Sequence, residues 1–145
     1  KKTYTNIFFP NNDVIDSYDE ALADMKKHGH EEGGWIFKNL KTGKMSSVRR
    51  DRHENPHPSE DSLHIYLGSP PNIPGEILVG TWHTHPGGGG PSGTVEKLSN
   101  GNIRYSGDFV ANHQMKVPGL VVTGSPTSRS YYAYDDSVVP EGCPK

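Results

Sequence analysis

The chain has 145 residues, the length of one domain, with 15 Lys and Arg against 17 Asp and Glu for a formal net charge of -2. This balance offers no basic field to a phosphate backbone, which argues against general nucleic-acid binding. No apolar run approaches the roughly 20 residues that a membrane span needs, so we expect a soluble domain with no membrane partner. The single cysteine, Cys143, permits no internal disulfide and no cysteine-based zinc site.

Only 31% of the residues are hydrophobic, and 17 Gly and 12 Pro gather in clusters. This composition predicts a small core that carries large loops. The chain starts Lys1-Lys2-Thr3, with neither an initiator Met nor a signal peptide. We therefore expect residues 1–145 to be a single domain from the C-terminal part of a longer protein.

The first half of the chain predicts one helix followed by strands. Asp13 can cap a helix whose apolar residues recur at spacings of three and four up to Gly29. Residues 35–40 and 45–49 read as the two strands of a hairpin. A polar loop at 51–61 leads to two further predicted strands, 62–67 and 76–83, which a proline-rich turn separates.

The second half predicts a Gly-rich loop, a short helix and two strands. The loop runs from Pro86 to about Tyr105, and because it is rich in Gly and poor in apolar residues, we expect it to be mobile and to cover a substrate channel. Ser106 can cap a helix at 107–116, and residues 119–123 and 129–134 read as strands. No repeat and no regular strand–helix alternation is present, which favours a mixed sheet with helices packed on it.

Six of the eight histidines are expected to be solvated or structural. His28 and His30 flank the end of the first helix, His53 and His57 lie in the polar loop, and His64 and His113 lie in a predicted strand and a predicted helix. The pair His83 and His85 differs from these. Side chains two apart in a strand project to one face, so both imidazoles can reach one metal ion at the end of the apolar strand 76–83.

A catalytic zinc site needs a third protein ligand and a group that accepts a proton from water. Two carboxylates compete for the ligand position: Asp108, in the first turn of the second predicted helix, and Glu96, in the polar loop. Glu31 and Glu32 compete for the role of general base, because both stand where a helix ends and a strand begins, next to two glycines.

Together these segments resemble the JAMM metallopeptidases, the JAB/MPN domain. That family has the pattern E-x-x-G-apolar-apolar, then H-x-H-P at a strand end, then S-x-x-D at a helix start. The stretch from Glu31 to Ile36 matches the first, His83-Thr84-His85-Pro86 matches the second, and Ser106-Gly107-Asp108 approximates the third with one intervening residue instead of two. The segment from Ser92 to Glu96 lies nearer the usual distance but has Val95 where the Asp would fall, which favours Asp108. In its long loop before the third motif, the chain is similar to the bacterial JAMM-like domains found at the ends of secreted or polymorphic toxin proteins.

The resemblance implies an α/β (α+β) fold with a mixed, mostly antiparallel, curved sheet flanked by helices. It also implies that His83, His85 and Asp108 hold Zn(II), that Glu31 is the general base and acid, and that Ser106 hydrogen-bonds the oxyanion. The family register puts Glu32 one position too late, on the opposite face of the strand.

The implied activity is hydrolysis of an amide bond in a peptide, an isopeptide or a peptidoglycan cross-link, with a cognate immunity or inhibitor protein as a further partner. A catalytically silent interaction module of the same fold is the main alternative, and a metal-dependent nuclease toxin is a third. The location is left open between secretion as part of a larger bacterial protein and the cytoplasm.

Overall fold

The computed structural model describes residues 4–137, so Cys143 and the first three residues lie outside the described part of the chain. The elements in chain order are α1 (Thr5–Phe8), α2 (Asn12–His28), β1 (Gly33–Asn39), β2 (Met45–Arg49), β3 (Glu76–Thr84), β4 (Val95–Lys97), β5 (Ile103–Tyr105), α3 (Asp108–Met115), β6 (Gly119–Ser125) and β7 (Ser128–Tyr134).

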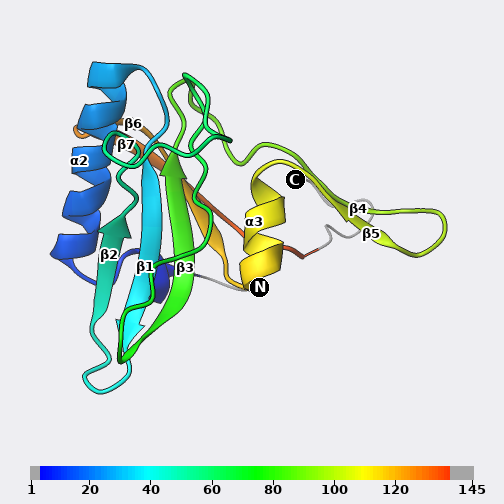
Figure 1. Ribbon diagram of the computed structural model, residues 1–145, viewed down its shortest axis with the longest axis horizontal. Coiled ribbons are helices and arrows are strands. Elements are labelled where there is room, and N and C mark those ends of the chain that lie inside the picture. Colours follow the sequence, from blue (N-terminus) through cyan, green and yellow to red (C-terminus); the bar gives the residue numbers. More distant parts are fainter. Residues whose placement is uncertain (1–3, 138–145) are drawn as a thin grey trace.

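Five strands form the main sheet, in the order β2-β1-β3-β6-β7. Every neighbouring pair is antiparallel except β3 and β6, which run parallel and are joined through α3. Helix α2 lies along one face of the sheet and α3 lies on the other side (Figure 1). The predicted fold class, a mixed and mostly antiparallel sheet flanked by helices, is thereby confirmed.

The hydrophobic core lies between α2 and the sheet. Its buried side chains are Phe8, Val14, Tyr18, Ala21, Leu22, Met25, Ile36, Trp82, Leu120 and Val122. The Tyr18 ring meets Trp82 edge to face with 5.1 Å between centroids, and its hydroxyl donates to the Phe8 carbonyl oxygen at 2.7 Å. This contact shows that Trp82, in the middle of the sheet, faces α2. Its neighbour His83 therefore faces the opposite side, because strand side chains alternate.

The N-terminal helix boundaries differ from the prediction. Asn11, rather than Asp13, caps α2, since its side-chain oxygen accepts the Val14 N–H at 3.0 Å. Asp13 lies in the first turn instead, where a carboxylate suits the helix dipole. Helix α2 ends as predicted at Gly29, which adopts a left-handed conformation with φ 70°. The short helix α1 was not predicted.

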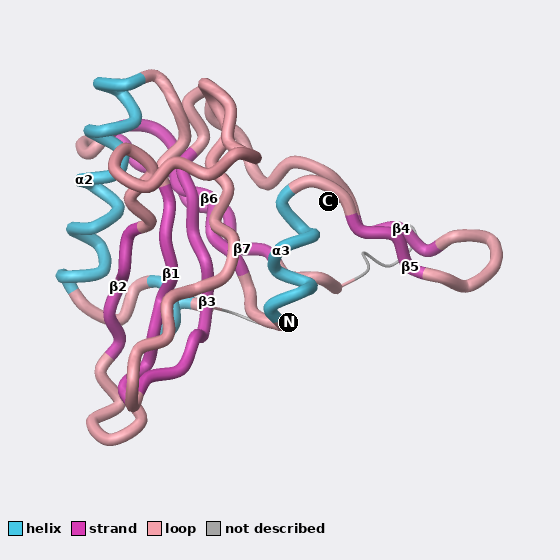
Figure 2. Tube along the Cα trace, viewed as in Figure 1, coloured by secondary structure: helices cyan, strands magenta, loops and turns pink. Residues whose placement is uncertain are grey.

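Two predicted segments differ more strongly. Residues 62–67 form no strand. Their backbone groups form hydrogen bonds with Glu31 instead of pairing with a neighbouring strand. The predicted loop 86–105 contains a two-stranded sheet, β4 with β5, which projects away from the body of the molecule (Figure 2). Within residues 4–137, no helix combines the length and the apolar character needed to cross a membrane.

Candidate metal centre

The antiparallel pairing of β1 with β3 brings the start of one strand to the end of the other. Gly33 stands opposite His83 in this register, and the residues just before β1 therefore meet those just after β3. The contact is closed by Thr84, whose N–H donates to the Glu32 carbonyl oxygen at 2.8 Å and whose hydroxyl accepts the Glu32 N–H at 2.9 Å. This arrangement places Glu31 next to the two histidines.

His83 and His85 are both buried, and their Nε2 atoms lie 2.9 Å apart. The His85 backbone is held by β6: its N–H donates to the Val122 carbonyl oxygen at 3.1 Å, and its carbonyl oxygen accepts the Thr123 hydroxyl at 2.9 Å. Two imidazole nitrogens are thus directed at one point by backbone hydrogen bonds of the sheet, as the H-x-H spacing predicts.

Asp108 brings a carboxylate to the same point from the start of α3. Its Oδ2 atom lies 3.2 Å from His83 Nε2 and 3.4 Å from His85 Nε2. The same oxygen accepts the Ser92 N–H at 2.7 Å, and the Asp108 N–H donates to the Ser92 carbonyl oxygen at 2.9 Å. Asp108 is therefore oriented by Ser92, which is 16 residues earlier in the chain.

Glu31 approaches the histidine pair from the segment between α2 and β1. Its Oε2 atom lies 3.8 Å from His85 Nε2, while its Oε1 atom accepts the Ile65 N–H at 3.0 Å. The Glu31 backbone N–H donates to the Leu63 carbonyl oxygen at 2.7 Å. One carboxylate oxygen is thus anchored and the other is directed toward the histidines. Glu31, His83 and His85 form a buried group that could hold a metal ion.

The loop that anchors Glu31 is itself held by buried charges. The Arg52 guanidinium donates to the carbonyl oxygens of Glu31 and Asp61, each at 2.8 Å. Glu60 accepts the N–H groups of His57 and Tyr66 and pairs with Arg50 at 2.7 Å. Burial works to raise the pKa of the Glu60 carboxyl, but the two N–H groups and the arginine charges outweigh it and lower that pKa.

The charges of the centre favour a cation. Burial opposes ionisation of Asp108, yet hydrogen bonds from His83, His85 and the Ser92 N–H hold the pKa of its carboxyl well below the ordinary value. The hydrogen bond with Asp108 raises the pKa of His85, against the effect of burial. Burial, together with the charges of Asp108 and Glu31, raises the pKa of Tyr134, so its phenol stays neutral.

A cavity of about 420 Å³ opens onto the centre, a volume typical of small-ligand sites. Glu31, His83 and Asp108 lie in its wall, with apolar side chains such as Ile65 and Val110 around them. Among the described residues, those that line it come largely from the 65–70 segment and α3. The segment 86–105, which was expected to cover a substrate channel, contributes no residue to the lining of this cavity.

The remaining predicted residues lie elsewhere. The Ser106 hydroxyl accepts the Thr94 N–H at 2.9 Å and also lies 3.2 Å from the Thr94 hydroxyl. Glu96 lies on the β4–β5 hairpin, where it pairs with Arg104 at 2.8 Å. The Glu32 carboxylate lies on the other face of the sheet, 2.8 Å from Arg49.

Sequence reasoning set Ser92 aside because Val95 follows it where the motif has Asp, and so missed the part that Ser92 plays beside Asp108. The signal that could have found it is a repeated dipeptide, Ser92-Gly93 and Ser106-Gly107, which flanks the hairpin. Both glycines have positive φ, and a Cβ on Gly107 would collide with the Ser92 carbonyl oxygen. The two ends of the hairpin therefore touch, and Ser92-Gly93 lies directly against Gly107-Asp108.

Comparison of the chain with protein-family models, with curated proteins and with solved structures finds no match.

Proposed function

We propose that the chain is a zinc-dependent amide hydrolase of the JAMM type. The observation that carries the proposal is the convergence of Glu31, His83, His85 and Asp108, which come from three separate segments. Three of the four, Glu31, His83 and Asp108, lie in the wall of one cavity. Two imidazole nitrogens and a carboxylate oxygen within 3.4 Å of both are the donor set of a catalytic zinc site, in which three protein ligands leave a position open.

In this proposal His83, His85 and Asp108 hold Zn(II). A zinc ion bound there supplies an activated water and polarises the carbonyl of the scissile amide. Glu31 accepts a proton at Oε2 and later delivers it to the leaving nitrogen, while the Ile65 N–H on Oε1 keeps the carboxylate in place. No protein nucleophile is required, and none is assigned.

The resemblance assigns the oxyanion donor to Ser106, but the Ser106 hydroxyl is engaged by Thr94. Ser92 is the serine whose backbone is bonded to Asp108, so we include it as the second candidate for this role. Alanine substitutions at the two positions separate them: the donor's loss lowers the rate, by roughly 100-fold or more on the scale of oxyanion-hole donors, and the other substitution does not.

If Asp108 lay far from the histidines, the structure would favour the alternative, a catalytically inactive interaction module. The 3.2 and 3.4 Å distances favour the enzyme instead. The test is expression of wild type and Glu31→Gln in the bacterial cytoplasm and periplasm, followed by assay of peptides, isopeptides and peptidoglycan cross-links. Inhibition of growth by the wild type alone, in one compartment, identifies the substrate class. Equal effects of the two proteins and no hydrolysis of any of the three amides would refute the proposal.

A further inference from the structure

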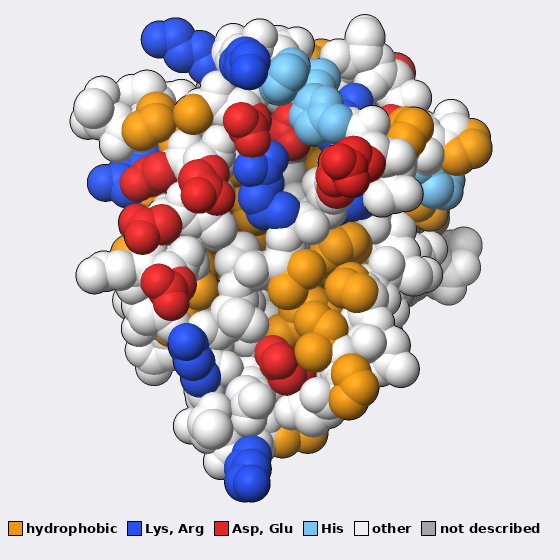
Figure 3. All heavy atoms as spheres, turned by 60° about the vertical axis from the view of Figure 1, so that its left-hand side comes forward, with side chains coloured by type: hydrophobic (Ala, Val, Ile, Leu, Met, Phe, Trp, Pro, Cys, Tyr) orange, Lys and Arg blue, Asp and Glu red, His pale blue; other side chains and the backbone are white. Residues whose placement is uncertain are grey.

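A second group of histidines lies on the α2 side of the sheet. His28 at the end of α2, His30 before β1 and His53 after β2 each offer a ring nitrogen, and these three nitrogens lie within 4.8 Å of one another. The rings pack together, with centroid distances of 4.5 to 5.4 Å. Histidine side chains gather at this end of the molecule beside acidic and basic ones (Figure 3). The sequence predicts only separate surface residues here.

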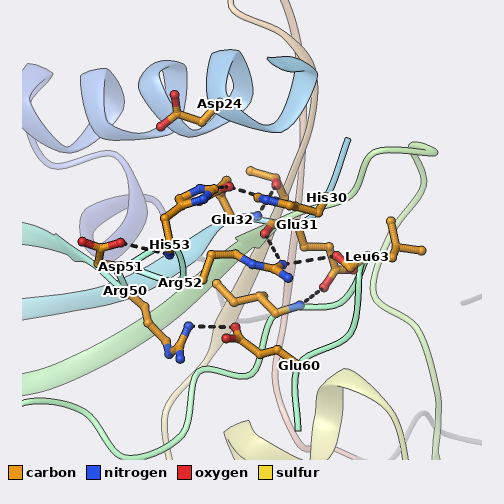
Figure 4. Close-up of polar contacts among 12 residues, drawn as sticks. Asp24, His30, Glu31, Glu32, Arg50, Asp51, Arg52, His53, Glu60 and Leu63 are labelled. Carbon is orange, nitrogen blue, oxygen red and sulfur yellow. Dashed lines mark hydrogen bonds and ion pairs between the residues drawn. The ribbon is translucent and has the colours of Figure 1, made fainter. Parts of the chain in front are cut away.

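A buried carboxylate stands at the base of this group. The Glu32 side chain is 1% exposed, and its Oε2 atom lies 3.0 Å from His30 Nδ1 and 3.2 Å from His53 Nε2 (Figure 4). Its other oxygen accepts from Arg49 at 2.8 Å. The His30 Nδ1 atom is itself buried and, despite its closeness to Glu32, has no aligned hydrogen-bond partner. Glu32 is thus the ion-pair neighbour of both His30 and His53.

We propose that His28, His30 and His53 bind a second transition-metal ion, with Glu32 as the carboxylate that orients the histidines and balances the charge. Imidazole is the ligand that Zn(II), Cu(II) and Ni(II) share, and a carboxylate behind the ligating histidines is the usual support for such a site. Zinc–nitrogen bonds of about 2.0–2.1 Å put ligand nitrogens about 3.4 Å apart. The exposed rings of His28 and His53 can close the remaining gap by small rotations.

The second site joins three segments, and it lies on the face of the sheet opposite to the first centre. Glu31 and Glu32 are adjacent and face opposite sides of the sheet, so each serves one histidine group. His53 follows Arg52, whose guanidinium holds the Glu31 carbonyl oxygen. A metal ion on His53 therefore fastens the loop that also provides the Ile65 N–H to the Glu31 carboxylate. We assign the second ion a structural role, which does not depend on the proposed hydrolase activity.

The test measures Zn(II) and Co(II) binding to untagged protein by native mass spectrometry and calorimetry. Wild type is expected to bind two ions, the double variant His83→Ala/His85→Ala one, and His28→Ala/His53→Ala one. The matched control His57→Ala/His64→Ala, which removes two histidines outside both groups, should still bind two. In His83→Ala/His85→Ala, zinc should raise the Tm and slow amide exchange in residues 50–66.

Two results would overturn the second site. One is a wild type that binds a single ion which His28→Ala/His53→Ala retains. The other is two ions in both of these proteins. If His83→Ala/His85→Ala does not fold, the comparison of wild type with His28→Ala/His53→Ala still decides the question. A wild type that binds one ion, lost only on substitution of His28 and His53, would uphold the second site and refute the hydrolase centre.

Discussion

The adjacent glutamates offer a direct test of the division between the two faces of the sheet. Glu31→Gln keeps the size of the side chain and an oxygen that can accept the Ile65 N–H, so the unfolding free energy should change by less than about 1 kcal/mol. The variant loses the group that takes up the proton. Its rate of amide hydrolysis should therefore fall roughly 100- to 10,000-fold, the scale of general acid–base catalysis.

Glu32→Gln should have the opposite profile. Removing one partner of a buried ion pair costs about 3–5 kcal/mol. Here Arg49 is 25% exposed and keeps a second partner, Asp24, at 2.7 Å, so we expect about 2 kcal/mol for the metal-free protein. At about 3 °C per kcal/mol for a chain of this size, the Tm should fall by roughly 6 °C.

Thermal unfolding in a chelator and hydrolysis of the identified substrate measure the two effects on the same samples. The expected pattern is an inactive, stable Glu31→Gln and an active, less stable Glu32→Gln. A Glu31→Gln with wild-type activity and an inactive, equally stable Glu32→Gln would transfer the base to Glu32. That result would refute the assignment of faces derived from the sheet register.

Three further predictions concern the surroundings of the centre. Asp108→Ala should lower zinc affinity at the first site at least tenfold, whereas Glu96→Ala should leave it unchanged; equilibrium dialysis of both variants against zinc measures this, and the reverse result would make Glu96 the ligand. The pKa of the Glu60 carboxyl is lowered in the folded state, so the ionised carboxylate stabilises the fold above the usual carboxyl pKa, and this stabilisation is lost as the pH falls below it. The Tm advantage of wild type over Glu60→Gln should therefore shrink between pH 7 and pH 3. A constant difference in Tm would contradict this. Excision of residues 94–106, which joins Gly93 to Gly107 where the hairpin ends already touch, should leave the fold and zinc binding intact; loss of zinc would show that the hairpin holds Asp108 in place.

The local part of the site could be predicted from the sequence. The two-residue spacing of His83 and His85 at the end of an apolar segment defines a shared face through strand alternation alone. Antiparallel pairing of the neighbouring strand then places Glu31 beside them. The strands of the main sheet were also predicted to within two residues, because their apolar patterns are continuous.

Contacts between distant segments could not be predicted in this way. Residues 62–67 have the composition of a strand, yet their backbone groups bond to Glu31, a partner that no local pattern reveals. The same holds for the second histidine group. His28, His30 and His53 are each ordinary surface residues in sequence, and only the folding of the 50–66 loop onto the end of α2 brings His53 to the other two.

The third motif shows why counting residues along the chain does not decide between Ser106 and Ser92. A pattern such as S-x-x-D reflects the path of the backbone just before a helix begins. An insertion whose two ends lie in contact leaves that path unchanged, although it increases the number of residues between Ser and Asp. Here Ser92-Gly93 and Gly107-Asp108 are in contact, and the hairpin between them returns to its point of departure. In space Ser92 is followed by Gly93, Gly107 and Asp108. This arrangement has two residues between Ser and Asp, as in S-x-x-D, whereas Ser106-Gly107-Asp108 has one. Ser106 is bonded to Thr94 in the hairpin, whereas the Ser92 backbone is bonded to Asp108, so both serines stay candidates for the proposed role and the two alanine substitutions test them.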